Sequence, residues 1–252
     1  MKTIQTDKLT TYIYETRGEM GAAAGKAAAD RIRKVLAQKP YANVIFAAAP
    51  SQNETLEALL KEDVDFTRIN AFHMDEYVGL SIADSQSFAT YLTEHLFSKA
   101  PFHSVNLIPA AADAEEGCAA YARLLSENPP DIVLMGIGEN GHIAFNDPPV
   151  ADFNDPKVIK AVQLDEICRQ QQVNDKCFPN LDAVPRYALT LTIPTLLSAA
   201  HLICSVPGST KAAAAKQMLT GEIGEACPAT ALRNHSDAVM FLDADSAALL
   251  EA

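Results

Sequence analysis

Residues 131–138 read DIVLMGIG, a continuous apolar run that ends in a glycine-rich turn. An apolar run without polar alternation is typical of a strand buried on both faces of a parallel sheet. Similar short runs, rich in apolar or β-branched residues, occupy residues 10–15, 43–50, 67–75, 187–194, 201–208 and 239–243. We therefore predict that DIVLMGIG is the strongest strand of a largely parallel sheet.

Stretches with helical spacing of apolar residues separate these runs, at residues 18–38, 54–62, 87–97, 118–127 and 209–221. Alternation of strands and helices is typical of an α/β fold with a mostly parallel central sheet and helices on both faces. No repeat or linker divides the series, so we predict one domain over residues 1–252. The turn-rich segment at about 145–182 is predicted to be an irregular, lid-forming insertion.

The composition limits the functions open to this chain. Its 252 residues are 48% hydrophobic and carry a formal net charge of −12, which argues against nucleic acid as a partner. The N-terminus lacks a signal-peptide pattern and no apolar run is long enough to span a membrane, so we expect a cytoplasmic protein. The five scattered cysteines form no C-x-x-C pair, so they suggest neither a zinc site nor a disulfide framework.

Polar side chains are concentrated directly after four of the predicted strands. Ligands of parallel α/β sheets bind outside the carboxyl ends of the strands, so these positions are the expected binding site. The four groups are Pro50–Asn53, His73–Gly79, Gly136–His142 with Asp147, and Pro207–Lys211.

Two of these groups could bind an anion. Gly208–Lys211 combines a helix start with an ammonium group, and Ser51–Asn53 also opens a helix. Free N–H groups and the helix dipole at such junctions are used to bind phosphates. Each junction alone is better explained as an ordinary helix N-cap. The presence of two in one sheet makes a phosphate site about as plausible as the caps.

The glycine pattern at residues 136–141 is formally G-x-G-x-x-G, but it does not indicate a dinucleotide site. Such a fingerprint must open a helix, whereas His142 follows at once and Pro148 forbids a continuing helix. The turn instead displays His142, which Asp147 could orient. A carboxylate from the Asp75–Glu76 pair could then act as a base with His142 as its partner acid. This set suits proton abstraction beside the carbonyl of a phosphorylated sugar.

Residues 72–80 (FHMDEYVGL) and 136–148 (GIGENGHIAFNDP) resemble the two signature motifs of the glucosamine-6-phosphate deaminase family. Residues 184–190 and 208–212 are similar to two further segments of that family, in the same order. The resemblance covers nearly the whole chain and implies a three-layer, Rossmann-like fold. It also implies an enzyme that converts glucosamine 6-phosphate and water to fructose 6-phosphate and ammonia, without metal or cofactor.

The resemblance implies a role for each candidate residue. Asp75 would move a proton from C2 to C1, and His142 would open the sugar ring, tuned by Asn140 and Asp147. Lys211 would hold the phosphate together with the loop Ala49, Pro50, Ser51 and Gln52, and Arg169 is the candidate for a further phosphate ligand. Glu76, Gly138 and Gly141 complete the predicted substrate-binding set.

Three departures from the family pattern leave the substrate open. The family usually has aspartate at position 140 and glutamate at 147, so Asn140 lacks a charge and Asp147 is shorter by about 1.5 Å. The loop at 47–52 is also rich in alanine instead of glycine, threonine and serine. A 6-phosphogluconolactonase of the same superfamily and a non-catalytic sugar-phosphate-binding protein remain alternatives. The choice between glucosamine and galactosamine, the oligomeric state (the family's enzymes are often oligomers) and any allosteric site also stay open.

Overall fold

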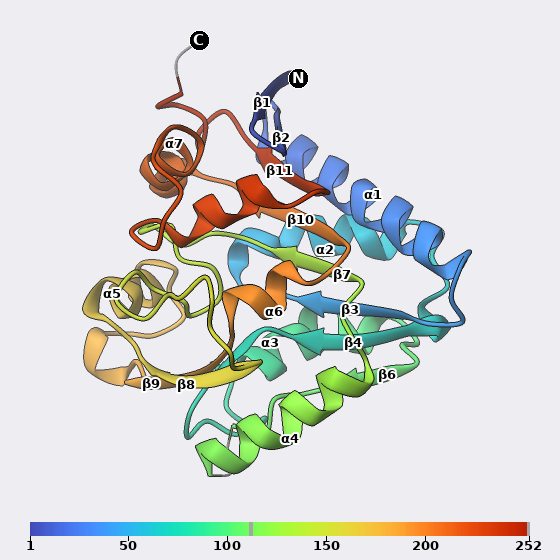
Figure 1. The fold of residues 1–252 in the computed structure, drawn as a ribbon, viewed down its shortest axis with the longest axis vertical. Coiled ribbons are helices and arrows are strands. Elements are labelled where there is room, and N and C mark those ends of the chain that lie inside the picture. Colours follow the sequence, from blue (N-terminus) through green and yellow to red (C-terminus); the bar gives the residue numbers. More distant parts are fainter. Residues whose placement is uncertain (111–112, 251–252) are drawn as a thin grey trace.

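The computed structural model of the chain describes residues 1–110 and 113–250, and its centre is a sheet of eight strands. All neighbouring strands in this sheet are parallel except β1, which pairs antiparallel with β2. The predicted mostly parallel sheet is therefore confirmed (Figure 1). In spatial order the strands are β1 (Lys2–Thr6), β2 (Leu9–Ile13), β11 (Ala238–Leu242), β10 (His201–Val206), β7 (Ile132–Met135), β3 (Ala42–Phe46), β4 (Ile69–His73) and β6 (Ser104–Asn106).

Helices cover both faces of this sheet, as predicted for a three-layer fold. Side chains along β7 alternate between two hydrophobic cores, with Val133 and Met135 in one and Ile132 and Leu134 in the other. The second core also contains residues of α1 (Arg17–Leu36), α2 (Asn53–Lys61) and α3 (Phe88–His95). The first contains residues of α4 (Ala114–Glu127), α6 (Ile193–Leu197) and α7 (Ala212–Thr220). Among the described residues, no helix is both long and apolar enough to cross a bilayer.

Short 3-10 turns connect several of these elements. They are η1 (Pro50–Gln52), η2 (Phe66–Arg68), η3 (Phe97–Lys99), η4 (Leu181–Ala183), η5 (Ser209–Lys211) and η6 (Pro228–Asn234).

A second, smaller sheet of three antiparallel strands lies beside the first. Its order is β5 (Asp75–Tyr77), β9 (Tyr187–Leu191) and β8 (Ile159–Gln163). The segment predicted to be irregular at about 145–182 thus contains a strand, β8, and a helix, α5 (Glu166–Asn174). The sequence did not indicate α5 because this helix is mostly polar and its apolar spacing is weak, whereas residues 145–158 and 175–180 contain no helix or strand.

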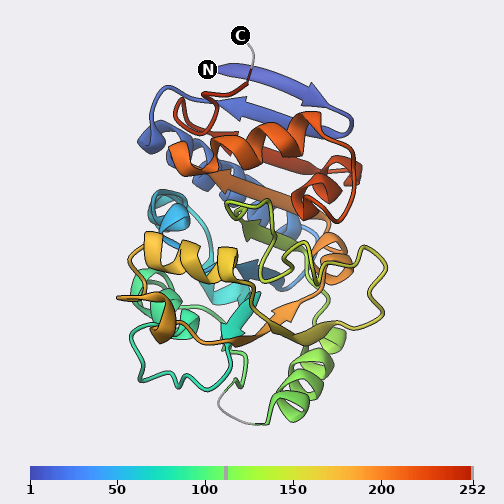
Figure 2. The same cartoon turned by 90° about the vertical axis from the view of Figure 1, so that its left-hand side faces the viewer.

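The N-terminus also differs from the prediction. One strand was expected at residues 10–15, whereas the structure has a hairpin of β1 and β2 at one end of the sheet (Figure 2, blue). The residues of β1 are largely exposed, so the sequence KTIQT lacks the apolar run that marks a buried strand.

The strand order reverses between β3 and β7. After β3 the chain forms β4, which pairs with the side of β3 that faces away from β7. After β7 the next strand of this sheet along the chain is β10, which pairs with the side of β7 that faces away from β3. Such a reversal leaves a crevice at the carboxyl ends of the strands, which is the usual ligand site of open α/β sheets. The four strands predicted to carry the polar groups, β10, β7, β3 and β4, are consecutive neighbours around this point (Figure 1).

Helices α1 and α2 pack closely on the outer face of the sheet because two glycines of α1 lie against α2. A Cβ atom on Gly21 would lie 2.2 Å from Cβ of Glu54, and one on Gly25 would lie 2.5 Å from Cβ of Ala58. The Gly25 position is also close to backbone atoms, with the nitrogen of Leu59 at 2.8 Å, so a small side-chain movement cannot relieve the overlap.

We predict that Gly25→Ala lowers the free energy of unfolding by about 1–3 kcal/mol, since the added methyl group must push α1 away from α2. Gly18→Ala is the matched control on the same helix, because a Cβ there meets nothing within 4 Å. It should be neutral or stabilising by about 0.5 kcal/mol. Denaturant unfolding of both variants checks this, and equal stabilities of the two variants would contradict the close packing.

Candidate active site

A cavity of about 650 Å³ opens at the strand reversal. The loops after β3, β4, β7 and β10 all contribute to its wall, together with residues near the start of α3 and the α5 segment. The polar and charged side chains on this wall are Arg17, Ser51, Gln52, Asp75, Ser85, Gln86, Tyr91, His142, Gln171, Gln172, Asp175, Lys176, Ser209, Thr210 and Lys211. The predicted convergence of four strand ends on one site is thus observed.

Asp75 lies on the cavity wall at the start of β5, and only 7% of its surface is exposed. Its backbone is fixed by the antiparallel pairing of β5 with β9, in which Asp75 is opposite Thr190. Burial, reinforced by the neighbouring charge of Glu76, raises the pKa of Asp75 well above its usual range. A carboxyl group of this kind binds a proton readily, as a general base requires.

His73, at the end of β4, holds the backbone of Asp75 from the other side. The N–H of Ile108 donates to Nε2 of His73 (2.8 Å), so the ring proton is on Nδ1, which faces the carbonyl of Asp75 at 3.0 Å. The hydroxyl of Tyr121 donates to the His73 carbonyl and accepts from its N–H. Burial lowers the pKa of His73 to about 4, so the ring is a neutral structural link near pH 7.

His142 lies flat against Gly138 and reaches the cavity. A Cβ atom on Gly138 would lie 2.1 Å from the ring of His142, so no other residue fits there without moving the imidazole. The loop closes on itself, because the N–H of Gly138 donates to the carbonyl of His142. Gly141 has a φ of 79°, a left-handed conformation that favours glycine. The glycine pattern therefore serves to position a histidine and not a helix.

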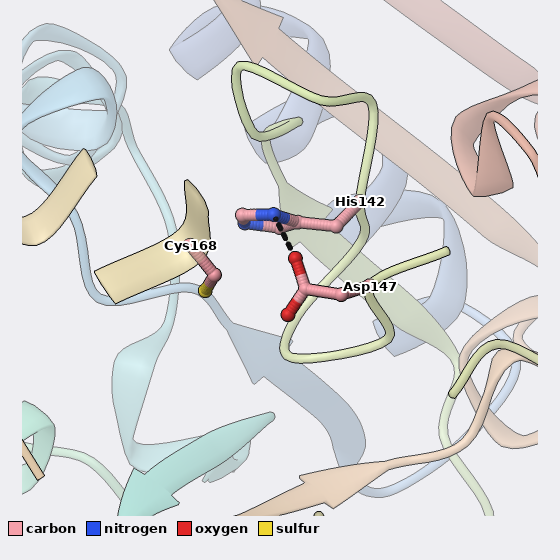
Figure 3. A group of neighbouring side chains, drawn as sticks. All are labelled: His142, Asp147 and Cys168. Atoms are coloured by element: carbon pink, nitrogen blue, oxygen red, sulfur yellow. Dashed lines mark ion pairs between the residues drawn. The ribbon is translucent and has the colours of Figure 1, made fainter. Parts of the chain in front are cut away.

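Asp147 and Asn140 lie next to His142 on the side away from the cavity. Oδ1 of Asp147 lies 2.9 Å from Nδ1 of His142 (Figure 3) and also accepts a hydrogen bond from the amide of Asn140. The ring nitrogen is close to Oδ1 but is poorly aligned for a hydrogen bond. Burial tends to raise the pKa of Asp147, but contacts with His142, Asn140 and Cys168 outweigh it and lower the pKa. Asp147 is therefore ionised near neutral pH.

The side-chain oxygen of Asn140 accepts from the backbone N–H of His142 at 3.0 Å. The amide thus bridges the histidine backbone and the Asp147 carboxylate, and both ends of Asn140 are used. Neither Asn140 nor Asp147 lies on the cavity wall, so both act on a ligand only through His142.

Lys211 is the buried cation of the cavity, with 5% of its surface exposed. No described carboxylate lies within ion-pair distance of its ammonium group. Burial lowers its pKa, which Asp175 and Glu139 oppose. The turn before it is fixed by Gly208, whose N–H donates to both oxygens of Asp243 at 3.0 Å. A buried, unpaired cation at the start of α7 is suited to an anionic ligand.

The loop after β3 supplies Ala49, Pro50, Ser51 and Gln52, all of which line the cavity as expected. Gln52 is buried, and its Nε2 donates to the carbonyl of Ser205 on β10. A Cβ on Gly136 would lie 2.9 Å from that same nitrogen, so the β3 and β7 loops are in close contact. The alanine-rich sequence thus forms a compact part of the cavity wall between the β7 loop and β10.

Three residues of the predicted substrate-binding set are placed elsewhere. Glu76 is buried away from the cavity, where its carboxylate accepts from the side chain of Ser87, from two backbone N–H groups at the start of α3 and from the backbone N–H of Tyr77. Arg169 donates to the carbonyls of Leu181 and Val184 and joins α5 to the following turn. Gly141 does not line the cavity, and a Cβ atom built on it would lie 2.5 Å from the sulfur of Cys227.

Several residues of the cavity wall were missed. Arg17 donates to Glu54 and to the carbonyl of Pro50, and Lys176 adds a further positive charge. Gln171 accepts from the N–H of Glu139 and connects α5 to the glycine-rich loop. The position of Arg17 at the start of a helix that follows strand β2 is the one signal that could have identified it. The predicted lid-forming segment contains α5, but nothing in the sequence singles out Gln171 and Gln172 on this helix.

The amino-acid sequence of the chain is similar to that of a known family of sugar-phosphate enzymes. Residues 15–241 match the family described as glucosamine-6-phosphate isomerases/6-phosphogluconolactonase. A glucosamine-6-phosphate deaminase of Listeria welshimeri is 38% identical over 211 residues, which cover 82% of this chain and 88% of that protein. One of Streptococcus sanguinis is 33% identical over 229 residues, covering 90% and 94%.

Solved structures give the same result. A monomeric glucosamine-6-phosphate deaminase is 33% identical, with a TM-score of 0.87 over 95% of this chain and 99% of the other. A 6-phosphogluconolactonase from Thermotoga maritima has a TM-score of 0.76 over 94% of this chain and the whole of the other. At 21% identity the lactonase shows a common fold and nothing more about activity.

The neutral state of His73 predicts a pH dependence of stability. The unfolded ring has a pKa of about 6.5, so between that value and about 4 the unfolded chain binds a proton that the folded chain does not. Stability must therefore fall as the pH falls, by about 2 kcal/mol from this group between pH 7 and pH 5.

Denaturant unfolding at both pH values, with His73→Asn, checks this expectation. The variant should lose less stability on acidification than the parent, whereas His103→Asn, at an exposed histidine, should keep the parent's pH dependence. The same pH dependence in His73→Asn and in the parent would mean that His73 is already charged in the folded state.

Proposed function

The chain belongs to the glucosamine-6-phosphate isomerase/6-phosphogluconolactonase family, and we propose that it converts glucosamine 6-phosphate and water to fructose 6-phosphate and ammonia. The observation that carries this proposal is the arrangement of Asp75, His142 and Lys211 around one cavity. These three groups correspond to a base, an acid and an anion-binding cation. An amino-sugar phosphate needs all three.

In the proposed first step, His142 opens the sugar ring. Its Nδ1 is adjacent to Asp147, which leaves Nε2 for the substrate. A proton delivered to the ring oxygen, together with loss of the proton from the C1 hydroxyl, gives the open-chain aldehyde. Asp147 stabilises the charged imidazole. Asn140 holds the Asp147 carboxylate beside the imidazole through a hydrogen bond to Oδ1. Hydrogen bonds in a free site are often poorly aligned and improve on substrate binding, so the present Nδ1 geometry is compatible with this role.

Asp75 carries the second step. Its carboxylate takes the proton from C2, and the electrons of that bond form an enol-type intermediate. The proton is returned at C1, water adds to the resulting C2 iminium group, and the amine leaves as ammonia. The raised pKa of Asp75 supports this role, because a stronger base removes a carbon-bound proton more readily.

Lys211 is proposed to hold the phosphate together with the Ser51–Gln52 end of the β3 loop. The protein carries a net charge of −12, which repels an anionic substrate. The buried ammonium group of Lys211 supplies the local positive charge that such a substrate needs. We also propose that the α5 segment, through Gln171 and Lys176, covers the bound substrate as a lid. Arg169 has no part in this proposal, since its guanidinium group serves the turn at Leu181–Val184.

A lactonase would need His142 to activate water but has no use for a buried base on the opposite loop. The presence of Asp75 on the cavity wall therefore favours the deaminase reaction over lactone hydrolysis. The two activities are separated by offering 6-phosphogluconolactone to the same protein preparation.

We expect the protein to release ammonia and fructose 6-phosphate in equal amounts from glucosamine 6-phosphate, without added metal or nucleotide. Asp75→Asn should lower kcat/KM by at least about a thousandfold, because the amide cannot accept the C2 proton. His142→Gln should lower it by about a hundredfold or more. Asp63→Asn, at an exposed carboxylate outside the cavity, is the control and should be fully active.

Other outcomes would redirect the proposal. Turnover of galactosamine 6-phosphate alone would retain the mechanism and change the substrate. Hydrolysis of 6-phosphogluconolactone that persists in Asp75→Asn would mean that the protein is a lactonase and not a deaminase. Binding of these phosphates with no turnover of any of them would make the chain a sugar-phosphate-binding protein.

Lys211→Met should raise KM by about ten- to a hundredfold with a much smaller effect on kcat, because it removes a charge-assisted contact to a group remote from the reacting carbons. Lys216→Met on helix α7, which directly follows Lys211, is the matched control, since Lys216 is exposed and does not line the cavity. Steady-state kinetics of both variants check this. An unchanged KM for Lys211→Met would mean that the phosphate does not bind at Lys211.

A further inference from the structure

Three buried side chains with metal-binding atoms meet next to the reaction site: His142, Asp147 and Cys168 (Figure 3). An imidazole nitrogen, a carboxylate oxygen and the thiol sulfur all lie within 4.8 Å of one another. His142 and Asp147 come from the segment after β7, whereas Cys168 comes from α5. The fold, and not closeness in sequence, brings the sulfur to the other two groups. The reaction proposed above uses His142 and Asp147 but gives no role to Cys168.

The cluster has unused capacity for a ligand. Nδ1 of His142 lies 2.9 Å from Oδ1 of Asp147 without an aligned hydrogen bond, and Oδ2 of Asp147 has no hydrogen bond of good geometry among the described residues, although the Cys168 thiol lies beside this carboxylate. The two side chains are only 9% and 2% exposed. A buried polar atom without a partner destabilises a protein by about 1–3 kcal/mol, so both atoms favour a ligand that can pair with them.

We propose that His142, Asp147 and Cys168 form a binding site for a single Zn²⁺-type cation, which inhibits the enzyme when bound. The donor set decides the type of ion. Imidazole, carboxylate and thiolate are the three common ligands of zinc, whereas Mg²⁺ and Ca²⁺ are bound by oxygen atoms and gain little from a thiolate. Three protein ligands also leave one position of a four-coordinate ion for water.

Binding the cation changes the protonation of two ligands. The Cys168 thiol releases its proton to solvent and binds as the thiolate, while Nδ1 of His142 binds with its lone pair and the ring proton moves to Nε2. The site is therefore selective for ions that bind sulfur strongly.

Inhibition follows from the atoms that the cation occupies, and this part of the inference rests on the proposed function. A metal-bound imidazole is held by the ion at Nδ1 and loses the contact with Asp147 that supports its charged form. His142 can then no longer alternate between acid and base at Nε2. The absence of a C-x-x-C pair argued against zinc, but that pattern detects only cysteine pairs that are close in sequence.

The first experiment measures binding alone, with Co²⁺ as a spectroscopic probe for zinc and with tag-free protein. One Co²⁺ per chain should bind and give a thiolate-to-cobalt charge-transfer absorption, displaced by Zn²⁺. Cys168→Ser should lose this absorption and bind Co²⁺ at least about tenfold more weakly. Cys118→Ser, at a half-buried cysteine on α4, should behave like the parent protein. Binding without a sulfur signal, or a signal that survives Cys168→Ser, would overturn the site.

X-ray absorption of the zinc-loaded parent protein supplies a test that needs no variant, and one sulfur ligand per zinc is expected. The inhibition is measured separately, with glucosamine 6-phosphate and a chelator to reverse it. Zinc should inhibit the parent and Cys118→Ser equally and Cys168→Ser at least about tenfold less. Zinc binding through Cys168 with no inhibition would overturn the inhibitory role. A protein without deaminase activity would still give the Co²⁺ result, so failure of the proposed function and failure of the metal site are distinguishable.

Discussion

A carboxylate that must accept a proton from carbon has to be held in place without a cation beside it, because a neighbouring positive charge would lower its pKa. Asp75 meets this condition: it makes no ion pair with any described residue and is held through its backbone. The strand pairing of β5 with β9 fixes one side, and the neutral ring of His73 fixes the other. The second sheet, the hydrogen bonds of Tyr121 and the burial of His73 all serve this one requirement.

The two departures from the family pattern compensate each other in the structure. The Asn140 amide donates to Oδ1 of Asp147 at 2.9 Å, so an aspartate at position 140 would place two carboxylates in direct contact. Like charges at that distance cannot both stay ionised. The shorter side chain of Asp147 still reaches Nδ1 of His142. Asn140 and Asp147 are therefore a matched pair that keeps a single negative charge beside the histidine.

Much of the site could be predicted because four buried strands end side by side, and apolar runs identify such strands in a sequence. The errors have equally physical causes. Successive residues of a strand point to opposite faces, so Glu76 turns away from the cavity that Asp75 faces. Arg169 lies on the face of α5 that is turned toward Leu181, while Gln171 and Gln172 face the cavity. The polar helix α5 and the exposed strand β1 lack the apolar pattern on which the predictions depended.

The burial of Asp75 has a consequence for the fate of hydrogen isotopes. Asp75 is only 7% exposed and lies on the cavity wall, so a substrate bound in the cavity would limit the exchange of its proton with bulk water. In the proposed reaction, a deuterium taken from C2 would thus remain on Asp75 until it is returned. Part of the label would then appear at C1 of the product even in ordinary water. The amount of deuterium retained at C1 of the sugar would therefore report how well the fold shields Asp75 from water.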